Sequence, residues 1–89
     1  MVRVSFTANL QRHVSAPGAE APAGTLRAVL EAVFAQRPGL RGYVLDDQNG
    51  VRKHVTVFID GTQIGDRANL SDEVRDGAEV WVMQALSGG

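Results

Sequence analysis

The 89-residue sequence contains no cysteine, and this absence excludes several kinds of chemistry. Neither a disulfide framework nor a thiolate metal cluster can hold the fold, and no thiol can act as a nucleophile. Hydrophobic packing must therefore stabilise the chain, and an apolar content of 44% is enough for one small core. A chain of this length has no material for a second domain with its own core.

Long apolar runs and a dominant charge are lacking too. No segment approaches the roughly 20 apolar residues that a membrane-spanning helix needs, and the N-terminus lacks the basic and apolar regions of a signal peptide. We therefore expect a cytoplasmic protein that does not insert into membranes. The formal net charge is only −1 and the arginines are scattered along the chain, so we expect no nucleic-acid partner.

Hydrophobic periodicity predicts a strand at the N-terminus and one helix after it. Val2, Val4 and Phe6 alternate with polar residues, as in a strand with one buried face. Thr25 is a suitable N-cap, because its hydroxyl can accept a hydrogen bond from an unpaired amide of the first turn. The helix should end at Pro38, since proline cannot continue the hydrogen-bond ladder. Its apolar face consists of residues at spacings of three and four: Leu26, Val29, Leu30, Val33 and Phe34.

The segments on either side of this helix are predicted to be irregular. Residues 9–24 are rich in proline and glycine, which favours a turn, a loose edge strand and a loop. Residues 40–53 contain the turn-forming run from Asp46 to Gly50, and we expect a surface connection there. The sequence therefore predicts a single helix.

The second half of the chain has the composition of strands and turns. Residues 55–59 are β-branched and aromatic, and the following Asp60-Gly61 is a strong hairpin signal. Residues 70–77 form a short link with turn residues, and the last strand is expected from Val80 to Met83.

These elements predict an α+β fold, in which one main helix packs across one face of a mixed sheet of four to five strands. The strands would give alternate residues to the core: Val2, Val4, Phe6, Val55, Val57, Ile59, Val80 and Val82. The opposite face would expose Thr56, Phe58, Trp81 and Met83. Large exposed apolar side chains often mark contact surfaces, so we predict that Phe58, Trp81 and Met83 dock a partner. A register shifted by one residue would instead bury Trp81 in the core.

No catalytic or metal-binding constellation is evident in the sequence. His13 and His54 have no ligand-spaced companion, and we expect them to be exposed to solvent. Asp46 and Asp47 suit acid–base chemistry as a pair, but the surrounding turn already accounts for short polar side chains. Glycine-rich phosphate loops are absent as well. We therefore expect that the chain is not an enzyme.

The last five residues differ from the rest of the chain: Ala85, Leu86, Ser87, Gly88 and Gly89. They lack periodicity and end in two glycines, which is typical of a mobile arm. We therefore divide the chain into a domain over residues 1–84 and a flexible C-terminal tail over residues 85–89. Glycines can pass through a narrow channel, so the tail is suited to carry its carboxylate into a partner's active site. A frayed end is the simpler alternative.

Taken in order, these features resemble the MoaD/ThiS family of ubiquitin-like sulfur carriers, which have the β-grasp fold. The resemblance rests on the alternating first strand, the helix start Gly24-Thr25-Leu26 and the stretch from His54 to Gly61. It is most specific at the end, where the strand after Asp76-Gly77 is followed by the tail with its Gly88-Gly89.

Two features depart from the family pattern. Gln84 and Ala85 stand where many relatives carry prolines. The link over residues 38–53 is longer than in the shortest thiamine-pathway carriers, and it is more similar to that of molybdopterin-synthase small subunits or cysteine-pathway carriers. This difference argues mildly against a role in the thiamine pathway.

The resemblance implies a function for the tail. An adenylating enzyme similar to ubiquitin-activating enzymes would join the Gly89 carboxylate to AMP, using ATP held in its own pocket. A sulfide or persulfide would then displace AMP and leave a thiocarboxylate, which a sulfur-accepting synthase would use. Residues 85–88 would be presented to the partners' active sites. The carrier itself would hold no tightly bound cofactor and no metal, and it would be monomeric on its own.

Two other functions stay open. Gly89 could be joined to target lysines, as in a ubiquitin-like protein modifier, or the chain could be a β-grasp interaction module with an incidental tail. The sulfur acceptor also stays open among molybdopterin, cysteine, a thiolated tRNA base and other sulfur-containing metabolites. The partner enzyme, not the carrier, makes that choice.

Overall fold

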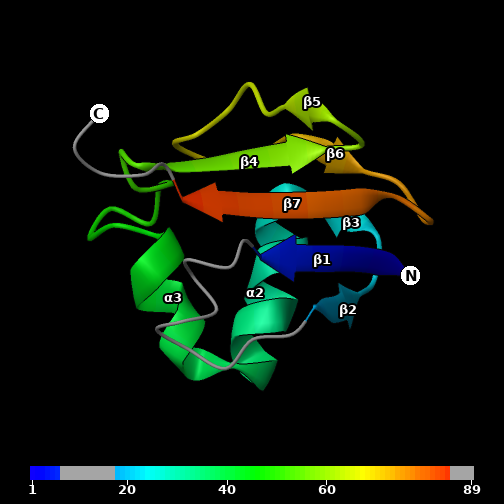
Figure 1. Cartoon of the computed structure of the whole chain (residues 1–89), viewed down its shortest axis with the longest axis horizontal. Coiled ribbons are helices and arrows are strands. Elements are labelled where there is room, and N and C mark those ends of the chain that lie inside the picture. Colours follow the sequence, from blue (N-terminus) through cyan, green and yellow to red (C-terminus); the bar gives the residue numbers. More distant parts are fainter. Residues whose placement is uncertain (7–17, 85–89) are drawn as a thin grey trace.

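The structure, a computed structural model, describes residues 1–6 and 18–84. A five-stranded mixed sheet in the order β2-β1-β7-β4-β5 forms one layer (Figure 1). Strands β1 and β7 pair in parallel at its centre, and the other pairs are antiparallel. The strands are β1 (Val2–Phe6), β2 (Ala19–Ala21), β4 (Val55–Ile59), β5 (Thr62–Gln63) and β7 (Glu79–Gln84). The predicted mixed sheet, with an edge strand before the helix, is confirmed.

Helix α2 (Leu26–Gln36) packs on one face of this sheet. Its N-cap is Thr25, as predicted, and the Thr25 hydroxyl accepts a hydrogen bond from the Ala28 amide at 3.2 Å. The five apolar residues that the periodicity placed on one helix face are all buried. The helix ends where the Arg37 amide donates to the Val33 carbonyl at 2.9 Å, one residue before Pro38.

A second helix, α3 (Pro38–Val44), follows at once and buries its apolar residues in the same core. The prediction of a single helix is therefore wrong, and so is the irregular connection over the first residues after Pro38. Proline ends α2, but it is also well suited to the first turn of a new helix, where its missing amide has no partner to lose. Leu40 and Val44 lie four residues apart and are both buried, and Gly39 and Gly42 obscured that period.

A second, two-stranded sheet ties the start of α2 to the link before β7. Strand β3 (Gly24–Thr25) pairs antiparallel with β6 (Glu73–Val74). The link over residues 70–77 was predicted without a strand, and this is corrected by the structure. Leu70 and Val74 are both buried, but a two-residue strand is too short to show a period in the sequence.

The predicted hairpin and turn are present. Asp60 and Gly61 both have positive φ, at 50° and 84°, which is the requirement of the tight turn that joins antiparallel strands. At the other turn, an Asp46 carboxylate oxygen accepts from the amides of Gln48 and Gly50 at 2.9 and 3.1 Å. Asp46 therefore has the local structural role that its sequence context indicated.

The strand alternation agrees with the prediction. The inward residues of β1, β4 and β7 are buried, except that Ile59 is only partly buried against the core. Within the described residues, no helix has the length and apolarity of a transmembrane span. The predicted loop over residues 7–17 and the predicted tail over residues 85–89 lie outside the described residues, so the division into domain and tail stays a prediction.

The N-cap gives a direct test of how α2 is held. Replacing Thr25 by alanine should lower the free energy of unfolding by about 1 kcal/mol, because the Ala28 amide loses its hydrogen-bond acceptor. Urea denaturation measures this loss. Thr25→Ser keeps the hydroxyl and should retain most of the stability. Equal losses in the two variants would show that the hydroxyl does not cap the helix.

Candidate functional site

The sheet face that points away from α2, here called the outward face, carries an apolar patch formed by Phe58, Trp81 and Met83. Trp81 is 41% exposed and Met83 is 39% exposed, although both are large and apolar. Phe58 is half-buried and lies opposite Trp81 in the β4–β7 register, while Thr56 lies opposite Met83. The predicted facing is therefore confirmed, and the alternative that buries Trp81 in the core is excluded.

The apolar patch is hollowed. Its three side chains and Gly61 line a shallow depression of about 340 Å³. Gly61 belongs to the β4–β5 turn, where a φ of 84° favours glycine over residues that carry a side chain. A side chain of a partner can therefore enter the depression beside Trp81, as in the pockets that receive anchor residues at protein interfaces.

The apolar patch lies beside the place where the tail begins. Strand β7 ends at Gln84, which pairs with Val55 at the start of β4, and Met83 is the last outward residue before it. Five further residues reach at most about 17 Å when extended. Ala85 to Gly89 lie outside the described residues, so the carrying role of Gly89 stays a prediction. A partner that receives this segment must approach within that reach of the patch.

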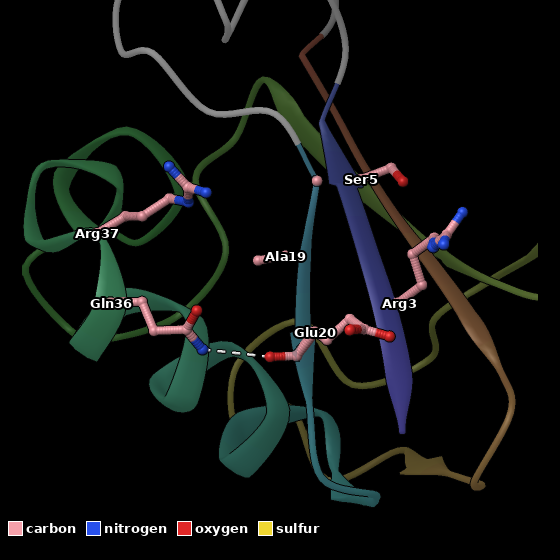
Figure 2. Close-up of a pocket in the computed structure, with 7 residues that line it drawn as sticks. Arg3, Ser5, Ala19, Glu20, Gln36 and Arg37 are labelled. Carbon is pink, nitrogen blue, oxygen red and sulfur yellow. Dashed lines mark hydrogen bonds between the residues drawn. The ribbon is translucent and has the colours of Figure 1, made fainter.

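Beyond the apolar patch, the outward face is charged. Arg3 lies between Glu20 on β2 and Glu79 on β7 in the register of the sheet. Figure 2 shows Arg3, Ser5 and Glu20 on the side of the strands away from the helix residues Gln36 and Arg37. These residues line a polar hollow of about 530 Å³ beside the edge strand β2.

The outer edge of β2 is closed by a helix side chain. The Gln36 side-chain amide donates to the Glu20 carbonyl at 3.2 Å (Figure 2). Since an unpaired strand edge invites pairing with another chain, this contact protects the short edge strand.

The titratable residues His54 and Asp66 lie outside the apolar patch and have ordinary structural settings. His54 is exposed, as predicted, and His13 lies outside the described residues. No group of three or more metal-ligating side chains comes together in the part of the chain that the structure describes. The pKa of Asp66 is lowered, chiefly because the Ser71 hydroxyl donates to its carboxylate, and this contact holds a turn.

Sequence reasoning missed two parts of the site. It did not include Gly61, although the hairpin signal already fixed that residue beside the end of β4. It also missed the charged row of Arg3, Glu20 and Glu79, because a row across strands follows from strand order, and the parallel pairing of β1 with β7 leaves no local signal.

A model of the ThiS family matches residues 4–89, which is nearly the whole chain and includes both terminal glycines. No curated protein matches the chain at a significant level.

Solved structures with the same fold cover nearly the full length of both chains. A chain from the Amycolatopsis orientalis BexX/CysO complex has 22% identity and a TM-score of 0.84, with 100% of each chain covered. Mycobacterium tuberculosis CysO has 21% identity and a TM-score of 0.82, with 97% of this chain and 100% of that chain covered. SAMP1 from Haloferax volcanii has 20% identity and a TM-score of 0.81, with 99% and 98% covered. These similarities establish the ubiquitin-like β-grasp fold.

Proposed function

Because this chain belongs to the ThiS family, we propose that it is a sulfur carrier whose Gly89 carboxyl group is activated by a partner enzyme and converted to a thiocarboxylate. The observation that carries the proposal is the extent of the family match, which runs through β7 and the tail to Gly89. A match confined to the globular part would support the fold equally well but would say nothing of the tail.

The chemistry follows from the weakness of a carboxylate as an acyl donor. A Gly89 carboxylate oxygen attacks the α-phosphate of ATP in the partner's pocket, and pyrophosphate leaves. Hydrosulfide then attacks the acyl carbon of the mixed anhydride, AMP leaves, and a thiocarboxylate remains. If a protein persulfide is the donor, an acyl disulfide forms first and a thiol must reduce it. The carrier is the substrate in these steps, and we propose that it holds no cofactor.

The apolar patch is the proposed docking surface for the activating enzyme. It is the large exposed apolar surface nearest to the start of the tail, and a partner seated on Trp81 holds Gly89 within reach of its active site. Docking on the apolar patch then also brings the tail to the active site of the enzyme, because the patch lies beside the start of the tail. We propose that the carrier is monomeric until it docks.

The absence of cysteine gives a sharp test of this function. A thiol-alkylating reagent has no thiol to react with in the unmodified chain, so alkylation reports a thiocarboxylate. On protein purified from its own cells, we expect one alkyl adduct, located by fragmentation in the peptide that contains Gly89. Intact mass should show the replacement of one oxygen by sulfur before alkylation. Native protein that never carries the adduct would rule out the carrier function.

Protein modification is the second candidate, since the fold is also that of SAMP1, a small archaeal modifier protein. The activation step is the same, but a target lysine amine replaces hydrosulfide as the nucleophile. An immunoblot of cell extract then shows a ladder of isopeptide-linked conjugates that resists thiol reductants. A single band at the mass of the free chain, together with the alkyl adduct, favours the carrier.

A further inference from the structure

We infer that the outward face has an electrical polarity along β7, and that the activating enzyme presents basic side chains at one end and acidic side chains at the other. The acidic end of the face lies at the start of β7, and the basic end lies where the tail begins. This inference rests on the proposed function, because the partner is the enzyme that receives the tail.

The acidic end is formed by Glu20, Glu79 and Asp60, which are all exposed. Glu20 and Glu79 flank Arg3 in the register of the sheet, and Asp60 accepts a hydrogen bond from the Glu79 amide at 3.0 Å. The three carboxylates therefore lie at one end of the outward face. The Met1 ammonium at the same end is paired with Asp76, and Arg75 lies close to the start of β7. Three carboxylates against the guanidinium groups of Arg3 and Arg75 leave this end negative.

The basic end is formed by Lys53, which is exposed in the turn before β4. Val55 pairs with Gln84, so this turn lies beside the root of the tail. The turn is held in place from the helix side, because the Arg52 guanidinium donates to the Gly42 carbonyl of α3 at 2.7 Å and Arg67 donates to the Arg52 carbonyl at 2.6 Å. Lys53 makes no ion pair with any residue that the structure describes.

Nearby carboxylates do not cancel the basic end. Asp46 and Asp47 belong to the preceding loop, and Asn49 of that loop accepts from Arg27 of α2 and from Arg41 of α3. The loop therefore lies over the helices and not over the outward face. Asp46 is also occupied by the two amides of its own turn.

The two ends are far enough apart to act separately. Glu79 and Gln84 are five residue-to-residue steps apart along β7, or roughly 17 Å at the rise of a strand. This exceeds the Debye length of about 8 Å at physiological ionic strength, so a partner group near one end is screened from the other. The apolar patch lies between the two ends. Charge complementarity then sets the direction in which the partner docks, while the patch provides affinity.

Charge reversal at each end tests the polarity. We expect Glu79→Lys and Lys53→Glu each to lower kcat/KM for adenylation roughly five- to tenfold at low salt, with kcat unchanged, since charges at the edge of an interface act mainly on association. At high salt the loss should shrink to less than about twofold. The assay is ATP–pyrophosphate exchange with the purified activating enzyme that adenylates the wild-type chain.

The signs of the two effects separate polarity from net charge. Glu79→Lys makes the chain more positive and Lys53→Glu makes it more negative, so attraction through net charge alone predicts opposite changes. The double variant keeps the formal net charge of −1 and should be the slowest of the three. Glu73→Lys, an equal charge change at an exposed residue of β6, is the matched control and should behave as wild type.

Thermal melts check that the variants fold, and Glu79→Gln replaces Glu79→Lys if a lysine beside Arg3 destabilises the sheet. Opposite effects of the two reversals, or no salt-dependent loss in either, would overturn the polarity. If no activating enzyme adenylates the wild-type chain, the proposed function fails, and this inference fails with it.

Discussion

Deletion of Gly89 is expected to abolish ATP-dependent formation of the alkylatable thiocarboxylate. The truncated chain ends in the carboxylate of Gly88. That carboxylate lies about 3.5 Å short of the position at which the Gly89 carboxylate would react with ATP in the activating enzyme. Acyl transfer depends on reacting atoms at near-contact distance, so a shift of one residue removes the reaction rather than weakening it. The measurement is the alkyl adduct after incubation with activating enzyme, ATP and a sulfide source.

The same deletion should leave folding unchanged. The buried apolar side chains of the described structure come from residues 2–82, so the melting temperature should be that of the full chain within error. Addition of one alanine after Gly89 is the matched control, because it keeps both glycines but removes the free carboxylate from Gly89. That variant should be equally inactive. A truncated chain that still acquires sulfur would disprove the role of Gly89.

Replacement of Trp81 by alanine should weaken docking by about 2 kcal/mol, which is roughly a thirtyfold loss in kcat/KM for adenylation. The indole ring lines the apolar depression and is the largest side chain on the outward face. Because the ring is 41% exposed, its loss leaves no closed cavity, and the free energy of unfolding should fall only modestly.

The neighbouring Val82 provides the matched control. It points the other way from the same strand and is fully buried between the sheet and the helices. Val82→Ala should cost roughly 2 kcal/mol of folding stability while the folded fraction is adenylated normally. Urea denaturation and kcat/KM together separate the two variants. If Trp81→Ala proves strongly destabilised and its folded fraction docks normally, the patch is not the docking surface.

The elements that sequence patterns predicted well are those with local chemistry. Thr25 caps α2, five apolar residues share one face of that helix, and Asp60-Gly61 makes the tight turn, because each depends on residues a few positions apart. Helix α3 was missed because Pro38 both ends one helix and begins the next. Only the later residues Leu40 and Val44 distinguish the two cases.

The alternation of buried and exposed residues within a strand predicted which side chains of the candidate site share a face, but not which strands lie side by side. Alternation placed Phe58, Trp81 and Met83 on one face, and the structure agrees. It could not place Glu79 beside Arg3, because that contact depends on the parallel pairing of the first strand with the last. The polarity of the face is therefore a property of topology, and no window of the sequence contains it.

The pairing of β1 with β7 has a consequence for synthesis in the cell. Both central strands of the sheet come from opposite ends of the described chain, and β4 also pairs with β7. A chain still emerging from the ribosome without β7 leaves β1 and β4 with unpaired edges, so the sheet closes only after residues 79–84 are made. The segment that completes the fold is also the one from which the tail extends. Translation that stops before β7 is complete therefore gives an unfolded product for proteases to remove, and not a folded decoy that occupies the partner without a carboxylate to activate.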